Sequence, residues 1–121
     1  MADVVVTVPK DLWLDWLEEG DLPGEPWSGG SNHFWIARVP LPAIAPGERV
    51  YIVAYGRLRG YAPLVRIEEE CRLRPSRACL LRYDGAVALT IPEPIRGFQG
   101  WRGCWWPREA ELPFPEWRTD G

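Results

Sequence analysis

The sequence has little that would support metal binding or histidine chemistry. It contains a single histidine, His33. Its cysteines are Cys71, Cys79 and Cys104, and they lack the paired spacing typical of zinc ligands. We therefore expect no metal site, no cofactor and three reduced thiols that are at least partly buried.

The sequence also lacks any long hydrophobic run. No apolar stretch approaches the roughly 20 residues that a membrane-spanning helix needs. The start, MADVVVTVPKD, has neither the basic residues nor the long apolar stretch of a signal peptide. We expect a cytoplasmic protein that does not contact membranes.

Lysine is almost absent, since Lys10 is the only one among fourteen basic residues. The remaining bases are arginines and they concentrate in the middle of the chain. Residues 1–48 carry eight acids and two bases, residues 49–108 carry five acids and eleven bases, and residues 109–121 carry four acids and one base. Arginine suits planar, bidentate recognition of phosphates and bases. A GC-rich genome or adaptation to heat would also favour arginine, so both explanations stay open.

What the sequence has in abundance is turn formers and aromatic residues. Thirteen prolines and twelve glycines indicate many turns and few long helices. Apolar and β-branched runs predict strands, and the dipeptide Asp84-Gly85 predicts a two-residue hairpin turn within 79–91. The predicted strands are 3–8, 33–39, 49–56, 57–70 and the two arms of 79–91, with a short helix over 9–20. These elements predict one domain over residues 1–121, mainly β with one or two short helices, folded as a small β-barrel.

One segment resembles a known family. Residues 46–68, PGERVYIVAYGRLRGYAPLVRIE, resemble the core of PUA-like barrels, in particular the ASCH and EVE types. Those families share a Pro/Gly–Asp/Glu turn, an apolar strand, a glycine and a second strand of the form "grirGyapv". The positions that fit are Gly47, Glu48, 50–55, Gly56 and Gly60. The end of the chain, from Ile95 on, looks like that of uncharacterised bacterial and phage-type proteins.

The resemblance implies binding of RNA or of a modified nucleobase. Some ASCH proteins are amidohydrolases of acetylated cytidine and use a lysine, a threonine and a glutamate. Here Lys10 begins the predicted helix without matching partners. We therefore expect a binding module, and keep a nucleoside amidohydrolase as the least favoured alternative.

The residues YGRLRGY place Arg57, Arg59 and Tyr61 two positions apart on a predicted strand. Alternate residues of a strand share one face. The three side chains would therefore form a contact surface for phosphates and bases, or a solvated sheet face. Gly60 would permit close backbone approach.

Two further groups complete the predicted ligand site. Trp27, in a glycine-rich loop, and Trp35 are candidates for stacking on a base. The arginines of IRGFQGWRG, with its glutamine, could hold a phosphate: Arg96, Gln99 and Arg102.

The other tryptophans have two interpretations. Trp13 and Trp16 share one face of the predicted helix, which indicates core packing. The C-terminal aromatic residues would mainly fill the barrel, with one or two rings exposed. They are Trp101, Trp105, Trp106, Phe114 and Trp117.

These observations support two hypotheses from different classes. The first is a module that binds single-stranded RNA or a modified nucleobase in a cleft at the barrel mouth. Single strands are preferred because no helix suited to the major groove is apparent. The alternative is a protein-interaction or regulatory factor, because exposed tryptophan and arginine are also typical of protein interfaces. Either a monomer or a homodimer fits the sequence.

Overall fold

The described part of the protein is built from strands. The computed structural model describes residues 3–9, 31–72, 74–83 and 87–115. The strands are β1 Val4–Thr7, β2 Ser31–Ile36, β3 Arg49–Ala54, β4 Arg57–Glu68, β5 Ala78–Tyr83, β6 Val87–Thr90, β7 Trp101–Gly103 and β8 Leu112–Pro113. One short 3-10 helix, η1 Arg108–Ala110, is the only helical element within these ranges. The predicted helix over 9–20 lies outside the described residues, except for Pro9.

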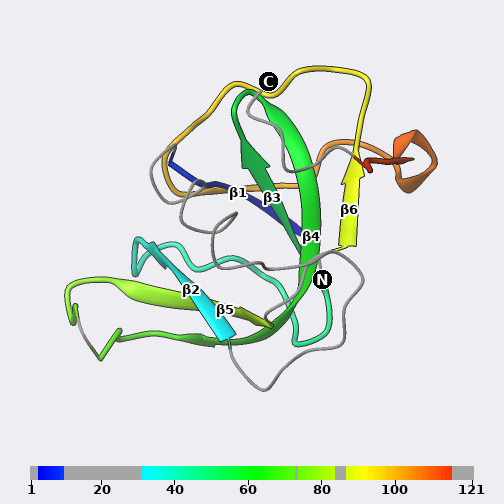
Figure 1. The fold of residues 1–121 in the computed structure, drawn as a ribbon. Helices are drawn as coiled ribbons and strands as arrows, with labels where there is room; N and C mark the ends of the chain where they lie inside the picture. Colours follow the sequence, from blue (N-terminus) through cyan, green and yellow to red (C-terminus); the bar gives the residue numbers. More distant parts are fainter. Residues whose placement is uncertain (1–2, 10–30, 73, 84–86, 116–121) are drawn as a thin grey trace.

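The strands form one strongly curved sheet. Its order is β2-β5-β4-β3-β1-β7, and β6 pairs with both β4 and β8. Among the strand pairs that the structure describes, β1 and β3 run parallel and the others are antiparallel. Figure 1 shows the sheet curling so that β2 and β5 face β1 and β3 across the interior, as half of a barrel. The prediction of a mainly β, barrel-like fold is confirmed. Within the described ranges no helix has the length and apolarity to cross a membrane.

A tight hairpin joins β3 to β4. Tyr55 and Gly56 form its two-residue loop, and both have positive φ, 51° and 73°. Two successive residues with positive φ define a type I′ turn, whose twist matches that of the flanking strands. The predicted turn at Gly56 is confirmed, and it places Arg57 at the first position of β4.

The predicted hairpin at Asp84-Gly85 is wrong. Both β5 and β6 pair antiparallel with β4, in succession along the same edge. Arg82 lies opposite Leu64, and Val87 lies opposite Tyr61. The chain therefore advances five residues from β5 to β6 while the partner strand β4 advances three. The two arms of the predicted hairpin therefore pair with β4, and the turn Asp84-Gly85 itself lies outside the described residues.

Alternation along the central strands creates two buried faces. On β1, Val5 faces one side while Val4 and Val6 face the other. The inner core lies inside the curve of the sheet and contains Val4, Val6, Ile36, Val50, Leu64, Ala78 and Leu80. It draws on five strands, which explains why the sheet must curl to bury it. An end core continues it near the β3–β4 turn and consists of Val8, Ile52, Ala54 and Phe114, with Phe34, Tyr55 and Ala88 packed against them.

The other face of the sheet is covered by the segment that follows β6. This outer core contains Val5, Tyr51, Val53, Leu58, Leu89, Ile91, Ile95 and Trp106. Trp106 is buried, Phe114 is buried in the end core, and Trp101 is partly buried against the inner core. Trp105 remains 46% exposed. The prediction that these aromatic residues mainly fill the core, with one or two rings exposed, is confirmed for the described ones: Trp101, Trp106 and Phe114 pack in the cores and Trp105 is the exposed ring. Trp117 lies outside the described residues, as do Trp13 and Trp16.

Candidate functional site

Two arginines contact one aromatic ring at the β3–β4 turn. The guanidinium carbon of Arg57 lies 4.2 Å from the centroid of Phe114, and that of Arg59 lies 5.5 Å from it. Arg59 is also 6.0 Å from the centroid of Tyr55. These distances lie within the range of cation–π attraction. The hairpin thus brings two cations and two aromatic rings together at one end of the sheet.

Arg59 is buried, with 1% exposure, so its side chain is not an exposed contact for a phosphate. Its Nε donates a hydrogen bond of 2.9 Å to the carbonyl oxygen of Ala54. Arg57 is half-buried, and no carboxylate of the described residues forms an ion pair with it. Arg57 therefore presents charge toward solvent, while Arg59 contributes charge from within the end core.

The predicted common face of Arg57, Arg59 and Tyr61 is wrong. The β3–β4 ladder shifts register between Ile52 and Val53, because Gly60 pairs with the first and Leu58 with the second. Arg59 is therefore an extra residue in β4, which reverses the alternation beyond it. Tyr61 lies on the opposite face, against the outer core.

Tyr61 contacts another arginine instead. The guanidinium carbon of Arg49 lies 3.9 Å from the Tyr61 centroid, and the ring of Tyr51 meets Tyr61 edge-on at 5.8 Å. These contacts make Tyr61 part of the packing of the outer core. Its predicted role in ligand binding therefore has no support from its position.

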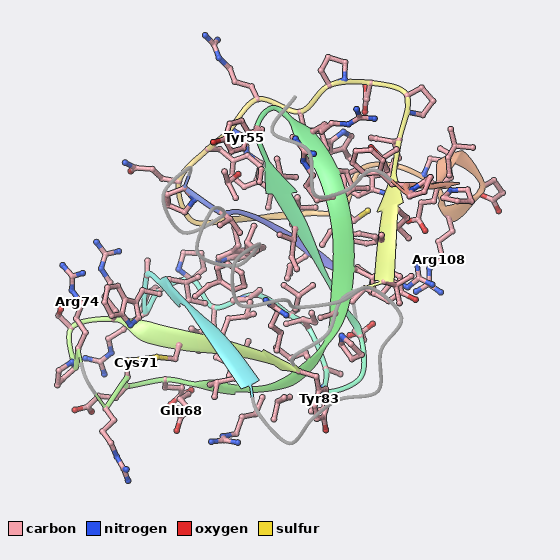
Figure 2. The ribbon with its side chains drawn as sticks, viewed as in Figure 1. Tyr55, Glu68, Cys71, Arg74, Tyr83 and Arg108 are labelled. Atoms are coloured by element: carbon pink, nitrogen blue, oxygen red, sulfur yellow. A yellow bond between two sulfur atoms is a disulfide. The ribbon has the colours of Figure 1, made fainter. Side chains whose placement is uncertain are left out.

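The segment after β6 carries three more predicted residues to the same turn. The backbone N–H of Ile95 donates to the carbonyl of Gly56 at 2.8 Å, which holds Arg96 beside the β3–β4 turn. Further on, the N–H of Phe98 donates to Thr7 Oγ1 at 3.3 Å. This end of the molecule is labelled by Tyr55 in Figure 2.

Arg102 completes this region from β7. Its guanidinium carbon lies 4.4 Å from the centroid of Phe98. Arg96, Gln99 and Arg102 are all exposed. We call the group the turn-end surface; it consists of Arg57, Arg59, Arg96, Gln99 and Arg102, with the rings of Tyr55, Phe98 and Phe114. Of the eight predicted site residues, the structure places Arg57, Arg59 and Arg96 at the β3–β4 turn, while Arg102 lies opposite Val5 on β1.

Trp35 lies elsewhere, on the first strand of the sheet order. Its side chain is 46% exposed, and it pairs in register with Cys79. The guanidinium carbon of Arg74 lies 4.9 Å from the Trp35 centroid. The other predicted stacking residue, Trp27, lies outside the described residues.

The sequence analysis missed the loop that carries Arg74. It joins β4 to β5, and its arginines at 72, 74 and 77 are exposed. We call Arg72, Arg74 and Arg77 the arginine loop; Figure 2 shows it extending from the β4–β5 end of the sheet, marked by Arg74 and Cys71. The signal that could have found it is CRLRPSRAC, in which a turn-forming Pro-Ser sits among three arginines.

The expectation of three reduced thiols is wrong. Cys71 and Cys79 form a disulfide that closes the base of the arginine loop, and Cys104 is the free cysteine. The hairpin register is the physical reason, because it brings the two Cα atoms to 5.2 Å, within the range that a disulfide spans. Burial raises the pKa of the Cys104 thiol.

A buried polar cluster lies under the outer core. Glu111 accepts hydrogen bonds from the Tyr51 hydroxyl, from Arg49 Nη1 at 2.8 Å and from Trp106 Nε1 at 3.0 Å. Burial and the hydrogen bond to Glu111 raise the pKa of Tyr51. With three donors on one carboxylate, this cluster fastens the C-terminal segment to β3.

Among the described residues, no three His, Cys, Asp or Glu side chains lie together. Lys10 lies outside them, and the side chains of residues 31–33, including His33, are not described. The described residues of the candidate site are thus cationic and aromatic side chains.

Comparison with known proteins gives one match. A family model described as a protein of unknown function (DUF1489) matches residues 34–109, more than half of the chain. No curated protein matches the chain, and no solved structure does. The matched segment runs from β2 to η1 and includes Trp35, the arginine loop and the arginines of the turn-end surface. The chain belongs to the DUF1489 family.

Proposed function

We propose that this protein binds single-stranded RNA or a nucleotide with a modified base, and that the turn-end surface holds the ligand. The observation that carries the proposal is the position of Arg57 and Arg96 at the β3–β4 turn, with Arg102 over Phe98, beside the half-buried rings of Tyr55 and Phe98. Arginines supply phosphate contacts, and aromatic rings supply stacking planes for bases. The resemblance to PUA-like barrels points the same way, and it stays a prediction.

Charge supports this assignment. Within the described ranges, no carboxylate forms an ion pair with Arg57, Arg96 or Arg102, whereas Arg49, Arg66 and Arg108 each have one. Arginines without a carboxylate partner repel one another, and an anionic ligand removes that repulsion. A phosphate-bearing ligand is therefore favoured at this end of the sheet.

The test is fluorescence-polarisation binding of a labelled single-stranded RNA and a labelled DNA duplex, each at several salt concentrations. The wild type should bind the single strand, with a log Kd that rises linearly with log salt. In the double variant Arg96→Ala/Arg102→Ala, two lost phosphate contacts should lower that slope by about 1.4.

Arg108→Ala is the matched control, because Arg108 is exposed but lies by Asp3, at the opposite end of β1. It should leave Kd and slope unchanged. Equal losses in both variants would indicate an unspecific effect of charge and would overturn the assignment of the site. Absence of any RNA or nucleotide binding by the wild type at low salt would overturn the function.

A protein-interaction role is the second candidate, and exposed apolar side chains favour it. Trp105 and Leu112 are 46% and 48% exposed, in the segment that covers the outer core. Tryptophan is enriched among the residues that dominate protein interfaces. A complex that withstands salt and is lost in Trp105→Ala, in a protein that binds no RNA, would establish this role instead.

A further inference from the structure

We propose that Trp35 and the arginine loop form a second contact for single-stranded RNA, where an unpaired base stacks on Trp35 and the arginines bind the adjoining phosphates. The inference rests on the proposed function for its ligand class. It goes further in requiring a strand of several nucleotides, because the arginine loop and the turn-end surface lie at different ends of the sheet (Figure 2).

The exposure of Trp35 follows from its place in β2. Its neighbours Phe34 and Ile36 pack against the end core and the inner core, so alternation directs Trp35 to the outer side. Trp35 therefore lies on the side of β2 that faces away from the inner core and the end core. A large ring that is nearly half exposed beside cationic side chains is suited to stacking.

Arg74 provides a second planar group beside the ring. Its guanidinium carbon lies 4.9 Å from the Trp35 centroid, within the distance for cation–π attraction. Nucleic-acid bases stack on aromatic rings and on guanidinium planes alike. Trp35 and Arg74 together thus present the two kinds of surface that bind an unpaired base.

A disulfide and backbone hydrogen bonds link the described residues of the arginine loop. The Cys71–Cys79 disulfide closes its base. Above it, the N–H of Cys71 donates to the carbonyl of Arg77 at 2.8 Å, and the N–H of Arg77 donates to that of Arg74 at 2.9 Å. A loop that is already ordered loses less conformational entropy when it binds, which favours affinity.

The charge of the loop fits a phosphate backbone. Arg72, Arg74 and Arg77 are exposed, and none forms an ion pair with a carboxylate of the described residues. The acids that precede the loop, Glu69 and Glu70, are exposed as well, and they leave the loop with a net positive charge. Because a base in a duplex is already stacked on both sides, a single strand is the form that this surface selects.

The experiment compares Trp35→Ala with Trp105→Ala, since both rings are 46% exposed. A labelled single-stranded RNA is titrated in each variant, and so is the same RNA annealed to its complement. Trp35→Ala should weaken binding of the single strand about tenfold or more, the factor that one stacked base contributes. Trp105→Ala should bind like the wild type, and neither change should affect the duplex.

Two further variants, Trp35→Phe and Arg74→Ala, distinguish a loss of RNA binding from a loss of folding. The phenylalanine variant should recover part of the affinity, because it keeps an aromatic plane. Arg74→Ala should weaken binding and lower its salt slope without changing the melting temperature. Unchanged affinity in both Trp35→Ala and Arg74→Ala would overturn the inference.

The two proposals fail in different ways. Loss of binding in Arg96→Ala/Arg102→Ala with none in Trp35→Ala overturns the second contact and leaves the proposed function standing. The reverse pattern supports the second contact and overturns the turn-end surface as the site. If the wild type binds no single-stranded RNA, both are overturned.

Discussion

The hydroxyl of Tyr51 donates a hydrogen bond to the carboxylate of Glu111, which lies 60 positions later in the chain. Tyr51 is fully buried on β3, and Glu111 directly precedes β8. Arg49 and Trp106 donate to the same carboxylate. One acidic side chain thus links the middle strand of the sheet to the segment that covers it.

Glu111→Ala should therefore destabilise the protein by about 3–5 kcal/mol, the range for removing one partner of a buried, charged cluster. The buried Tyr51 hydroxyl and the Trp106 N–H would both lose their acceptor. Chemical denaturation measures the change. Glu109→Ala, at an exposed glutamate of η1, is the control and should cost less than about 0.5 kcal/mol. Equal effects in the two variants would contradict the role of the cluster.

The same cluster predicts a pH dependence of stability. Burial, followed by the hydrogen bond to Glu111, raises the pKa of Tyr51 from its ordinary value of 10.0. Above pH 10 the unfolded chain then loses the Tyr51 proton while the folded chain keeps it, so the stabilisation is complete below pH 10 and declines above it. The free energy of unfolding should fall more steeply above pH 10 in the wild type than in Tyr51→Phe. If the free energies of unfolding of the two proteins fall in parallel with pH, the pKa of Tyr51 is the same in the folded and unfolded chains.

Gly60 allows β6 to approach β4 closely. A Cβ atom at this position would collide with the carbonyl oxygen of Val87. We expect Gly60→Ala to destabilise the protein by about 1–3 kcal/mol, because backbone atoms must move to admit the methyl group. Gly103→Ala is a matched control on β7, since a Cβ there has no atom within 4 Å. Thermal unfolding of both variants checks this, and a neutral Gly60→Ala would contradict the close packing of β4 and β6.

Much of the fold could be predicted because its strands carry strong local signals. The valines of β1 and the continuous apolar run of β3 indicate buried strands by composition alone. The turn at Tyr55-Gly56 was predicted from its glycine. Asp84-Gly85 carries an equally strong hairpin signal, yet the flanking strands β5 and β6 both pair with β4, because pairing partners depend on contacts distant in sequence.

The candidate site was predictable only in part for the same reason. A bulge adds one residue to a ladder and leaves no local mark, so the sequence could not reveal that Tyr61 departs from the face of Arg57. The convergence of Arg96 on the β3–β4 turn depends on one hydrogen bond between Ile95 and Gly56. Residue types indicated the chemistry, and only the fold shows which of them lie together.

Cys104 should react slowly with alkylating reagents in the folded protein. Burial raises the pKa of its thiol above the ordinary 9.0, so little thiolate exists near neutral pH. Iodoacetamide labelling, followed by mass spectrometry, should accelerate as pH rises past that value. In denaturant, the rate at neutral pH should increase to that of an unstructured cysteine. Fast labelling of the folded protein at neutral pH would contradict the burial of this residue.

The Cys71–Cys79 disulfide should stabilise both the fold and the arginine loop. A crosslink between residues separated by 8 positions is expected to contribute about 2 kcal/mol by restricting the unfolded chain.

Without reductant, denatured protein should show one thiol per chain, that of Cys104, and a dithiol reductant should raise this to three. Three thiols before reduction would contradict the crosslink. Cys71→Ser/Cys79→Ser should lower the free energy of unfolding by the same amount as reduction, while Cys104→Ser should leave the effect of reduction intact. Because Arg74 sits between the crosslinked residues, the double variant should also bind single-stranded RNA more weakly than the wild type, with a slower association that reflects a less ordered loop.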